Sequence, residues 1–154
     1  MKYSRAGFTL VETLLGLVVL TLAVTIVSLS FSKLKSHQAL DTSAAIVTAV
    51  LNEARSLTLS AYNDAQYGVH LEDTQVVLFR GSTYATSSTS NVVTTLHPLV
   101  GLHNISLVGS STNIVFQRLT GTTGQAGTLD RYLREGTTTY KRINIRSTGV
   151  AEVN

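Results

Sequence analysis

Hydrophobic and polar residues follow three successive patterns along the chain. Residues 13–31 form an apolar run without a charged side chain, and residues 33–62 carry apolar residues at three- and four-residue spacing. Beyond residue 63 the spacing falls towards two, and Gly, Ser and Thr become frequent. The patterns predict a helix that is apolar all round, a continuation with one apolar face, and a β-rich C-terminal region.

The two helical patterns are expected to form one helix. No Pro or Gly occurs between Gly16 and Gly68, so a single helix from about Phe8 to about Tyr62 is predicted, on the order of 80 Å long at 1.5 Å per residue. Its second half has an apolar stripe, widened on one side, that we expect to pack on the C-terminal region. The stripe consists of Leu40, Ala44, Val47, Leu51, Ala54, Thr58 and Ala61, and Ile46, Val50 and Leu57 widen it.

The remainder of the chain predicts a small antiparallel head. Tyr67–Leu71 and residues 75–79 are expected to pair as a hairpin through Glu72-Asp73-Thr74, and the Ser/Thr-rich segment 81–95 is expected to be a surface loop. Further strands are predicted over residues 102–108, 113–118, 128–133, 140–146 and 150–153. The fold class is therefore α+β: a long N-terminal helix packed against a small antiparallel β-sheet or sandwich.

The apolar run has the length of a membrane span, about 20 residues for a hydrocarbon core about 30 Å thick. No small-residue cleavage site follows it, as one would in a secretory signal peptide. Lys2 and Arg5 precede it, which predicts a cytoplasmic N-terminus and an outward head.

Glu12 is an acid near the start of this apolar segment, and burial of an acid at mid-bilayer costs roughly 2.5–3.5 kcal/mol. Either it lies at the headgroup level, or assembly supplies a cationic partner.

The junction between the basic leader and the apolar run has a specific sequence. It reads Gly7-Phe8-Thr9-Leu10-Val11-Glu12. Together with the basic leader before it and the apolar run after it, this sequence resembles the prepilin processing site of type IV pilins and type II secretion pseudopilins. The resemblance implies that the prepilin peptidase cuts after Gly7 and methylates the new N-terminus at Phe8. It also implies that Glu12 pairs with the N-terminal ammonium of a neighbouring subunit, so that two groups costly to bury alone neutralise each other.

The resemblance also implies an organisation and a set of partners. Residues 1–7 would be the prepilin leader, 8–32 the transmembrane and filament-core helix, 33–62 the amphipathic helix half and 63–154 the globular head. The partners would be other pilin or pseudopilin subunits in a helical filament, the prepilin peptidase, the inner-membrane assembly platform and, before assembly, the lipid bilayer. The chain would be a single-pass inner-membrane protein that later enters an extracytoplasmic filament. The absence of a Pro from the transmembrane part favours a minor pilin or pseudopilin.

The head has a second resemblance, to the GspH/FimT branch of minor pseudopilins and minor pilins. The segments that carry it are Ile114-Val115-Phe116-Gln117, Gly127-Thr128-Leu129, Ile143-Asn144-Ile145 and Ser147-Thr148-Gly149. The implied function is a structural subunit of a type IV pilus or type II secretion pseudopilus.

Composition and motifs argue against catalysis. The absence of Cys excludes disulfides, thiolate metal sites and a Cys nucleophile. The His residues at 37, 70, 97 and 103 lack metal-ligand spacing, and there is no G-x-S-x-G motif or phosphate-binding Gly loop. Glu72 with Asp73, and Asp130 with Glu135, are explained as turn residues. We therefore expect no enzymatic activity, no metal and no cofactor.

A cationic segment leaves an alternative function open. Its candidate polyanion-binding residues are Arg131, Arg134, Lys141, Arg142 and Arg146. In a strand Arg142 and Arg146 share a face with Tyr140, a ridge suited to a DNA backbone. However, cleavage after Gly7 lowers the net charge from +3 to +1.

DNA-binding FimT minor pilins carry a Gly-Arg-x-Arg motif near their end, and here the segment reads Gly149-Val150-Ala151-Glu152. Both arginines of the motif are missing and an acid is present, so a solvated strand face is the simpler interpretation of the cationic segment. The alternatives are a DNA-binding minor pilin in DNA uptake, a major pilin of a type IV-like filament, or a single-span protein with a sensing head.

Overall fold

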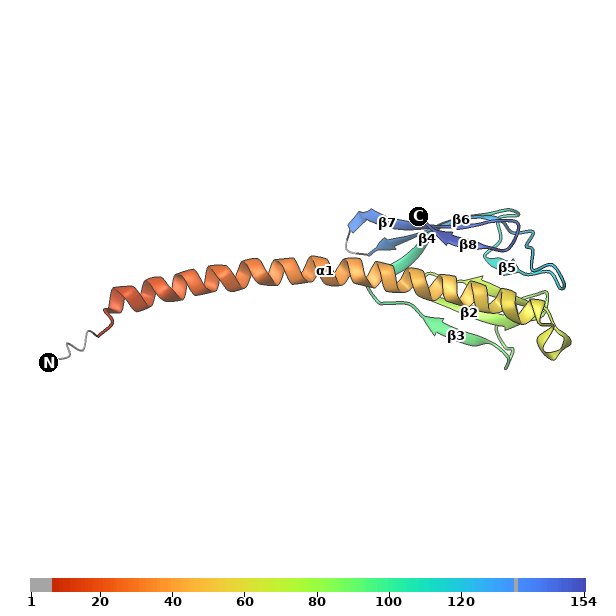
Figure 1. The fold of residues 1–154 in the computed structure, drawn as a ribbon, viewed down its shortest axis with the longest axis horizontal. Helices are drawn as coiled ribbons and strands as arrows, with labels where there is room; N and C mark the ends of the chain where they lie inside the picture. Colours follow the sequence, from red (N-terminus) through yellow and green to blue (C-terminus); the bar gives the residue numbers. More distant parts are fainter. Residues whose placement is uncertain (1–6, 135) are drawn as a thin grey trace. The chain divides into compact units, whose positions relative to one another are not determined.

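The computed structural model describes residues 7–134 and 136–154, without the side chains of residues 29–33 and 136–139. An α-helix, α1, spans Leu10–Leu59 and is followed by a short 3-10 helix, η1, at Tyr62–Asp64. Within the described residues eight strands follow (Figure 1): β1 Tyr67–Leu71, β2 Gln75–Arg80, β3 Val92–Thr95, β4 Val100–Leu107, β5 Asn113–Val115, β6 Gly127–Leu133, β7 Gly136–Ile145 and β8 Ala151–Val153. The expected α+β class is confirmed.

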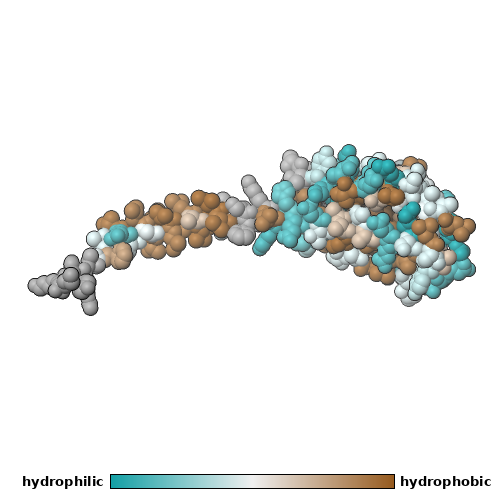
Figure 2. Space-filling model, viewed as in Figure 1, coloured by the Kyte–Doolittle hydropathy of each residue, from teal (hydrophilic) through white to brown (hydrophobic). Residues whose placement is uncertain are grey.

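Contacts within the chain divide it into two compact units, residues 1–36 and 37–154. In the first unit every described side chain from Gly7 to Ser28 is exposed. The helix segment Leu10–Ser28 has a mean hydropathy of 2.5 and is long and apolar enough to cross a membrane. Figure 2 shows this part of α1 as an almost continuous apolar surface.

The hydroxyl groups within this apolar segment are satisfied inside the helix. Thr13 and Thr21 each donate a hydrogen bond of 2.8 Å to the carbonyl three residues earlier, and Thr25 and Ser28 each donate one of 2.8 Å to the carbonyl four residues earlier. A hydroxyl without a partner would be costly in hydrocarbon, and these bonds remove that cost. The segment therefore presents an apolar surface despite its Thr and Ser residues.

The second unit contains two antiparallel four-stranded sheets. Their strand orders are β3-β2-β1-β5 and β4-β6-β7-β8. The predicted hairpin of β1 and β2 is confirmed, with Val69 opposite Leu78. The register of β4 against β6 shifts between His103 and Ser106, which marks a β-bulge in β4.

One hydrophobic core joins the second half of α1 to both sheets (Figure 1). Val47, Leu51 and Ala54 are at most 1% exposed and pack with buried residues of both sheets. Thr58 is also buried: its hydroxyl donates to the Ala54 carbonyl at 2.8 Å and accepts the Tyr67 amide at 3.0 Å. The sheet residues of this core are Tyr67, Val69, Leu71, Val76, Leu78, Leu102, Leu107, Ile114, Leu129, Ile143, Ile145 and Ala151.

The predicted stripe of α1 is buried from Leu40 to Thr58, but Ala61 lies outside it. The helix ends at Leu59, and the chain turns sharply through three residues with left-handed backbone conformations: Ala61 (φ 50°), Asn63 (φ 51°) and Asp64 (φ 54°). Ala61 is exposed in this turn. The short 3-10 turn therefore replaces the last helical turn that periodicity predicts.

The expectation of a loop over residues 81–95 is wrong for its last four residues. Val92–Thr95 forms β3, which pairs with β2 at the edge of the first sheet. Val92 and Val93 are 56% and 53% exposed. A short edge strand without a buried face lacks the alternation of apolar and polar residues by which a strand is recognised in sequence. Residues 92–95 therefore form a strand because they pair with β2, and not because of their own pattern.

Candidate functional site

The predicted processing junction is open and non-helical. Gly7, Phe8 and Thr9 precede α1, and Phe8 is 81% exposed. An added Cβ at Gly7 would meet no atom within 4 Å. The leader residues 1–6 lie outside the described residues. An exposed, non-helical junction next to a helix is the kind of segment at which proteases cut.

Glu12 lies in the first turn of α1, where a negative charge is favoured by the helix dipole. Its backbone amide donates a hydrogen bond of 3.2 Å to the Thr9 hydroxyl. This is the N-cap half of a capping box, with Thr9 as the cap and Glu12 three residues later. Thr9 is absent from the residues chosen on sequence, although the pattern T-x-x-E was its signal.

The Glu12 carboxylate is exposed, and no Lys or Arg of the described residues forms an ion pair with it. The surface around it is apolar, since Leu10, Val11 and Leu15 are 65–76% exposed. Such a continuous apolar surface requires lipid or protein to cover it. A carboxylate within it is therefore available to a cationic group from another chain.

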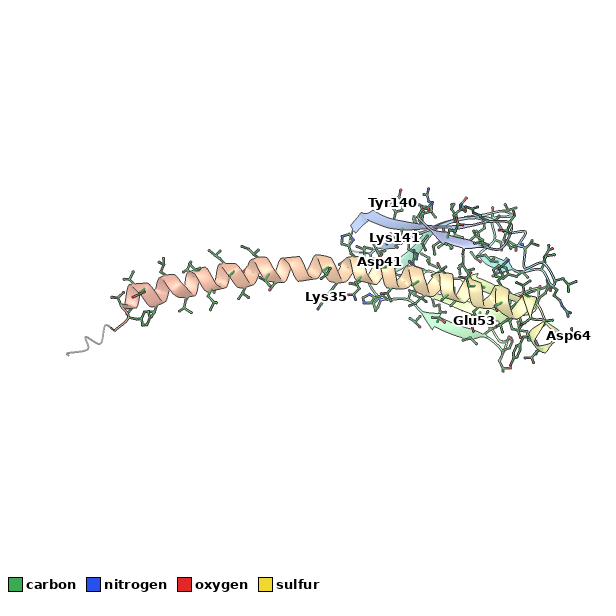
Figure 3. The ribbon with its side chains drawn as sticks, in the orientation of Figure 1. Lys35, Asp41, Glu53, Asp64, Tyr140 and Lys141 are labelled. Carbon is green, nitrogen blue, oxygen red and sulfur yellow. The ribbon has the colours of Figure 1, made fainter. Side chains whose placement is uncertain are left out.

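The structure does not assemble the five candidate polyanion-binding residues into one ridge. Four of them are partly or fully exposed, and each forms an ion pair with an acid of the same chain, as Lys141 does with Asp41 (both labelled in Figure 3). The pairs are Arg134–Asp73 at 2.5 Å, Arg142–Asp130 at 2.7 Å, Arg146–Glu152 at 2.7 Å and Lys141–Asp41, which links β7 to α1. Their charges are largely neutralised within the chain.

Arg131 is fully buried, with none of its surface exposed. Strand alternation explains this, because Leu129 and Arg131 point to the inner face of β6 whereas Asp130 points to the outer face. Within the described part of the chain, its three guanidinium nitrogens have no hydrogen-bond partner. Burial lowers the pKa of Arg131 to about 10, and the charge of Asp41 opposes that shift. Arg131 therefore does not belong to an exposed ridge.

Replacing Arg131 with Met is expected to stabilise the head. The buried charge lacks hydrogen bonds, and exchanging buried charges for apolar side chains of similar size is neutral or stabilising by about 1–4 kcal/mol. Arg134→Met is the matched control, because this exposed arginine is paired with Asp73 and its loss should change stability by only about 0–1 kcal/mol. Thermal unfolding of the two variants followed by circular dichroism checks this, and an Arg131→Met protein clearly less stable than wild type would contradict it.

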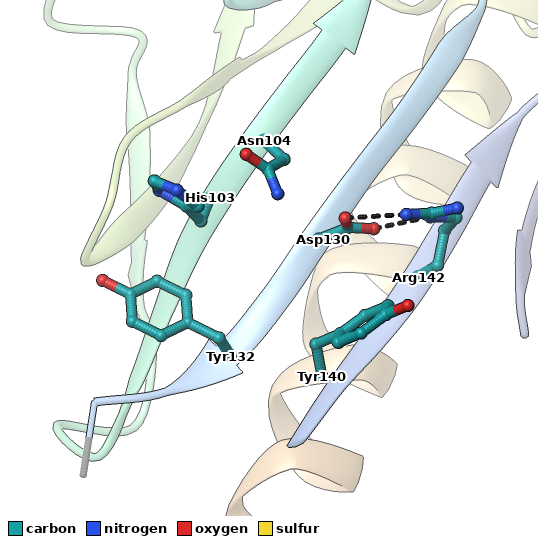
Figure 4. Close-up of a pocket in the computed structure, with 6 residues that line it drawn as sticks. All are labelled: His103, Asn104, Asp130, Tyr132, Tyr140 and Arg142. Carbon is teal, nitrogen blue, oxygen red and sulfur yellow. Dashed lines mark hydrogen bonds and ion pairs between the residues drawn. The ribbon is translucent and has the colours of Figure 1, made fainter. Parts of the chain in front are cut away.

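A pocket with a volume of about 440 Å³ lies on the outer face of the second sheet. Strands β4, β6 and β7 supply its lining residues (Figure 4): His103, Asn104, Asp130, Tyr132, Tyr140 and Arg142. The Arg142 guanidinium donates two hydrogen bonds to Asp130, at 2.7 and 2.9 Å. These bonds lower the pKa of the Asp130 carboxyl, so that the pair is ionised at neutral pH. The pocket could not be predicted from sequence, because it depends on the cross-strand register, although His103, Asp130, Tyr140 and Arg142 are each considered above in other contexts.

The remaining candidate groups have structural explanations. His70 is hydrogen-bonded to Asn113 at 2.6 Å, lies 3.3 Å from a Glu72 carboxylate oxygen and stacks on Tyr84 with ring centroids 4.0 Å apart. Glu72 also accepts a hydrogen bond of 2.6 Å from Gln75 across the β1–β2 turn. Among the described residues no three His, Cys, Asp or Glu side chains are grouped to hold a metal ion. The expectation that Asp130 is a turn residue is wrong, because it lies in the middle of β6 opposite Arg142, and Glu135 lies outside the described residues.

Comparisons with known proteins address both ends of the chain. Residues 2–28 match the family described as the prokaryotic N-terminal methylation motif. Among solved structures, the type IV minor pilin FimU of Pseudomonas aeruginosa matches with a TM-score of 0.57 at 15% identity, over 75% of this chain and 92% of that one. No curated protein sequence matches the chain. The expected resemblance to pilins is thereby confirmed for the N-terminal motif and for the fold.

Proposed function

We propose that this protein, with a prokaryotic N-terminal methylation motif and a pilin-like fold, is a structural, non-enzymatic subunit of a type IV pilus or type II secretion pseudopilus. One observation carries the proposal. The methylation motif at residues 2–28 coincides with an exposed apolar helix that has an acid in its first turn. A membrane anchor that later becomes the packed centre of a polymer needs both features.

The processing steps belong to this proposal. The prepilin peptidase cuts between Gly7 and Phe8 and methylates the new N-terminus. The Glu12 carboxylate then neutralises the terminal ammonium of a neighbouring subunit as the helices pack together. The exposed junction supports the first role, and a carboxylate that forms no ion pair with any described residue supports the second.

The location follows from the same segment. Before assembly the apolar helix lies in the inner membrane, with the leader in the cytoplasm and the head outside. The assembly platform then transfers the subunit from the bilayer to the filament, and side chains of other subunits replace lipid around residues 10–28. The apolar surface that is exposed in the isolated chain suits both environments.

The structure offers little support for the DNA-binding alternative. Phosphate contacts require free cationic side chains, whereas here the four partly or fully exposed cations of the segment are paired with acids and Arg131 is buried. For the major-pilin and membrane-sensor alternatives, the described residues provide no favouring feature. The minor pilin or pseudopilin function therefore remains the best supported.

Fractionation of cells that assemble filaments tests the proposed function. An epitope-tagged chain should appear in the sheared filament fraction when the assembly platform is present and stay in the membrane fraction when the platform is deleted. A marker protein with an unrelated single span should remain in the membrane in both strains. A chain that stays entirely in the membrane while filaments form would contradict a subunit function.

A further inference from the structure

The pocket on the second sheet is built from two cross-strand rows of side chains (Figure 4). His103 lies opposite Asp130, and Asp130 lies opposite Arg142. Tyr132 lies opposite Tyr140 in the next row. The His103 ring meets Tyr132 edge-on with centroids 5.4 Å apart, and Arg142 lies 5.7 Å from the Tyr140 ring centroid. Aromatic and planar polar groups are thus held at fixed positions around one hollow.

The β-bulge in β4 adds a further polar group to this pocket. Successive strand residues normally point to opposite faces of a sheet, so His103 and Asn104 would be separated. The register shifts just after His103, and Asn104 has a left-handed φ of 48°. As a result, both side chains line the pocket. Bulges that redirect side chains in this way are frequent beside binding and active sites.

The charges of the pocket disfavour an ionic ligand. Asp130 and Arg142 neutralise each other, and both Nε and Nη2 of Arg142 are engaged with Asp130. A phosphate or carboxylate that approached the remaining N–H groups of Arg142 would be repelled by the adjacent Asp130 carboxylate. A cation would find the Tyr140 ring already next to a guanidinium. The ligand that fits is therefore uncharged.

We propose that this pocket binds a neutral carbohydrate, with the Tyr132 and Tyr140 rings against the apolar face of a sugar ring and His103, Asn104 and the Asp130–Arg142 pair bonded to its hydroxyls. A sugar ring has C–H groups on one face and hydroxyls around its rim, which matches aromatic walls combined with planar donors and acceptors. The volume of about 440 Å³ lies within the usual size of small-molecule pockets. The head then carries a binding function in addition to its place in a filament.

Nuclear magnetic resonance on the full-length, isotope-labelled chain tests this proposal. The detergent must have no sugar headgroup, since such a headgroup would compete. The probes are methyl β-galactopyranoside, methyl α-mannopyranoside and N-acetylglucosamine, with inorganic phosphate as the charged comparison. At least one saccharide should shift the signals of His103, Asn104 and Tyr140 with a dissociation constant in the millimolar range, and phosphate should not.

Two variants probe the pocket and one serves as a control. Tyr140→Ala removes a wall that is 54% exposed and should weaken binding about tenfold, as expected for losing one aromatic contact. Asn104→Gly removes the side-chain amide and should also weaken binding. Gly is the chosen replacement because it readily adopts the left-handed backbone conformation of this position. Tyr62→Ala, which removes a 56% exposed ring outside the pocket, should leave it unchanged.

Three results would overturn the proposal. The first is that none of the saccharides shifts the pocket signals of the folded protein. The second is binding that is unchanged in both Tyr140→Ala and Asn104→Gly. The third is a response of these signals to phosphate instead, or only to filament assembly, which would make the pocket an anion site or a subunit contact.

Discussion

Glu12→Ala is expected to leave membrane insertion intact and to abolish incorporation into filaments. Removal of a carboxylate from the apolar segment makes insertion easier, because an acid there carries a desolvation cost. In the filament the same change leaves the neighbouring N-terminal ammonium without its partner. Removing one member of a buried ion pair costs about 3–5 kcal/mol, which is enough to exclude a subunit from a polymer. The measurement compares the amounts of the variant in the membrane and the sheared filament fractions.

Two further variants separate the charge of Glu12 from its role in capping α1. Glu12→Gln keeps a side chain that suits the capping box but removes the charge, so assembly should fail as it does with Ala. Thr9→Ala removes the cap at a cost of about 1 kcal/mol but keeps the charge, so assembly should continue. If Glu12→Gln enters filaments normally and Thr9→Ala does not, Glu12 has only a local function in the helix.

Gly149→Ala is expected to destabilise the head strongly. Gly149 has a left-handed φ of 80°, and its amide donates a hydrogen bond of 2.8 Å to the Arg146 carbonyl in the turn before β8. An added Cβ would lie 2.0 Å from the carbonyl oxygen of Gly121 and 3.1 Å from Nε of Arg55. The clash is with backbone, so no rotamer change relieves it. The combined cost of left-handed strain and overpacking is about 2–5 kcal/mol.

Gly109→Ala is the matched control for that change. Gly109 has nearly the same backbone angle, φ 82°, but an added Cβ there meets no atom within 4 Å. This variant should therefore be destabilised only by the left-handed backbone strain, about 1–2 kcal/mol. Thermal unfolding of the three proteins followed by circular dichroism in the same detergent gives the comparison. Equal destabilisation by the two variants would show that the contact with Gly121 is unimportant.

The features that could be predicted from sequence are those with local causes. The β1–β2 hairpin consists of two short apolar runs on either side of a polar turn, and both its strand pairing and the bounds of β1 are confirmed. The helix stripe from Leu40 to Thr58 follows from three- and four-residue spacing alone. In contrast, β3 is defined by its neighbour β2 and has no pattern of its own.

The site residues also divide into those that a local motif identifies and those that depend on the tertiary structure. Gly7, Phe8 and Glu12 are neighbours in sequence, so a motif is sufficient to select them as candidates, and their roles stay predictions. The ion pair of Asp41 with Lys141 joins residues far apart in the chain and depends on how the second sheet packs on α1. Arg131, predicted to be a polyanion-binding residue, is an exception: it alternates with Asp130 and shares a strand face with Leu129, a local pattern from which its inward side chain could have been predicted.

Mass spectrometry of the N-terminus of the chain taken from sheared filaments tests the central claim most directly. Processing followed by polymerisation predicts a polypeptide that begins at Phe8 and carries one added methyl group on its α-amine. A Gly7→Leu variant in the same cells should keep its full length and stay in the membrane fraction. A filament-associated chain that begins at Met1, or at any residue other than Phe8, would contradict the proposed processing and the role assigned to Glu12.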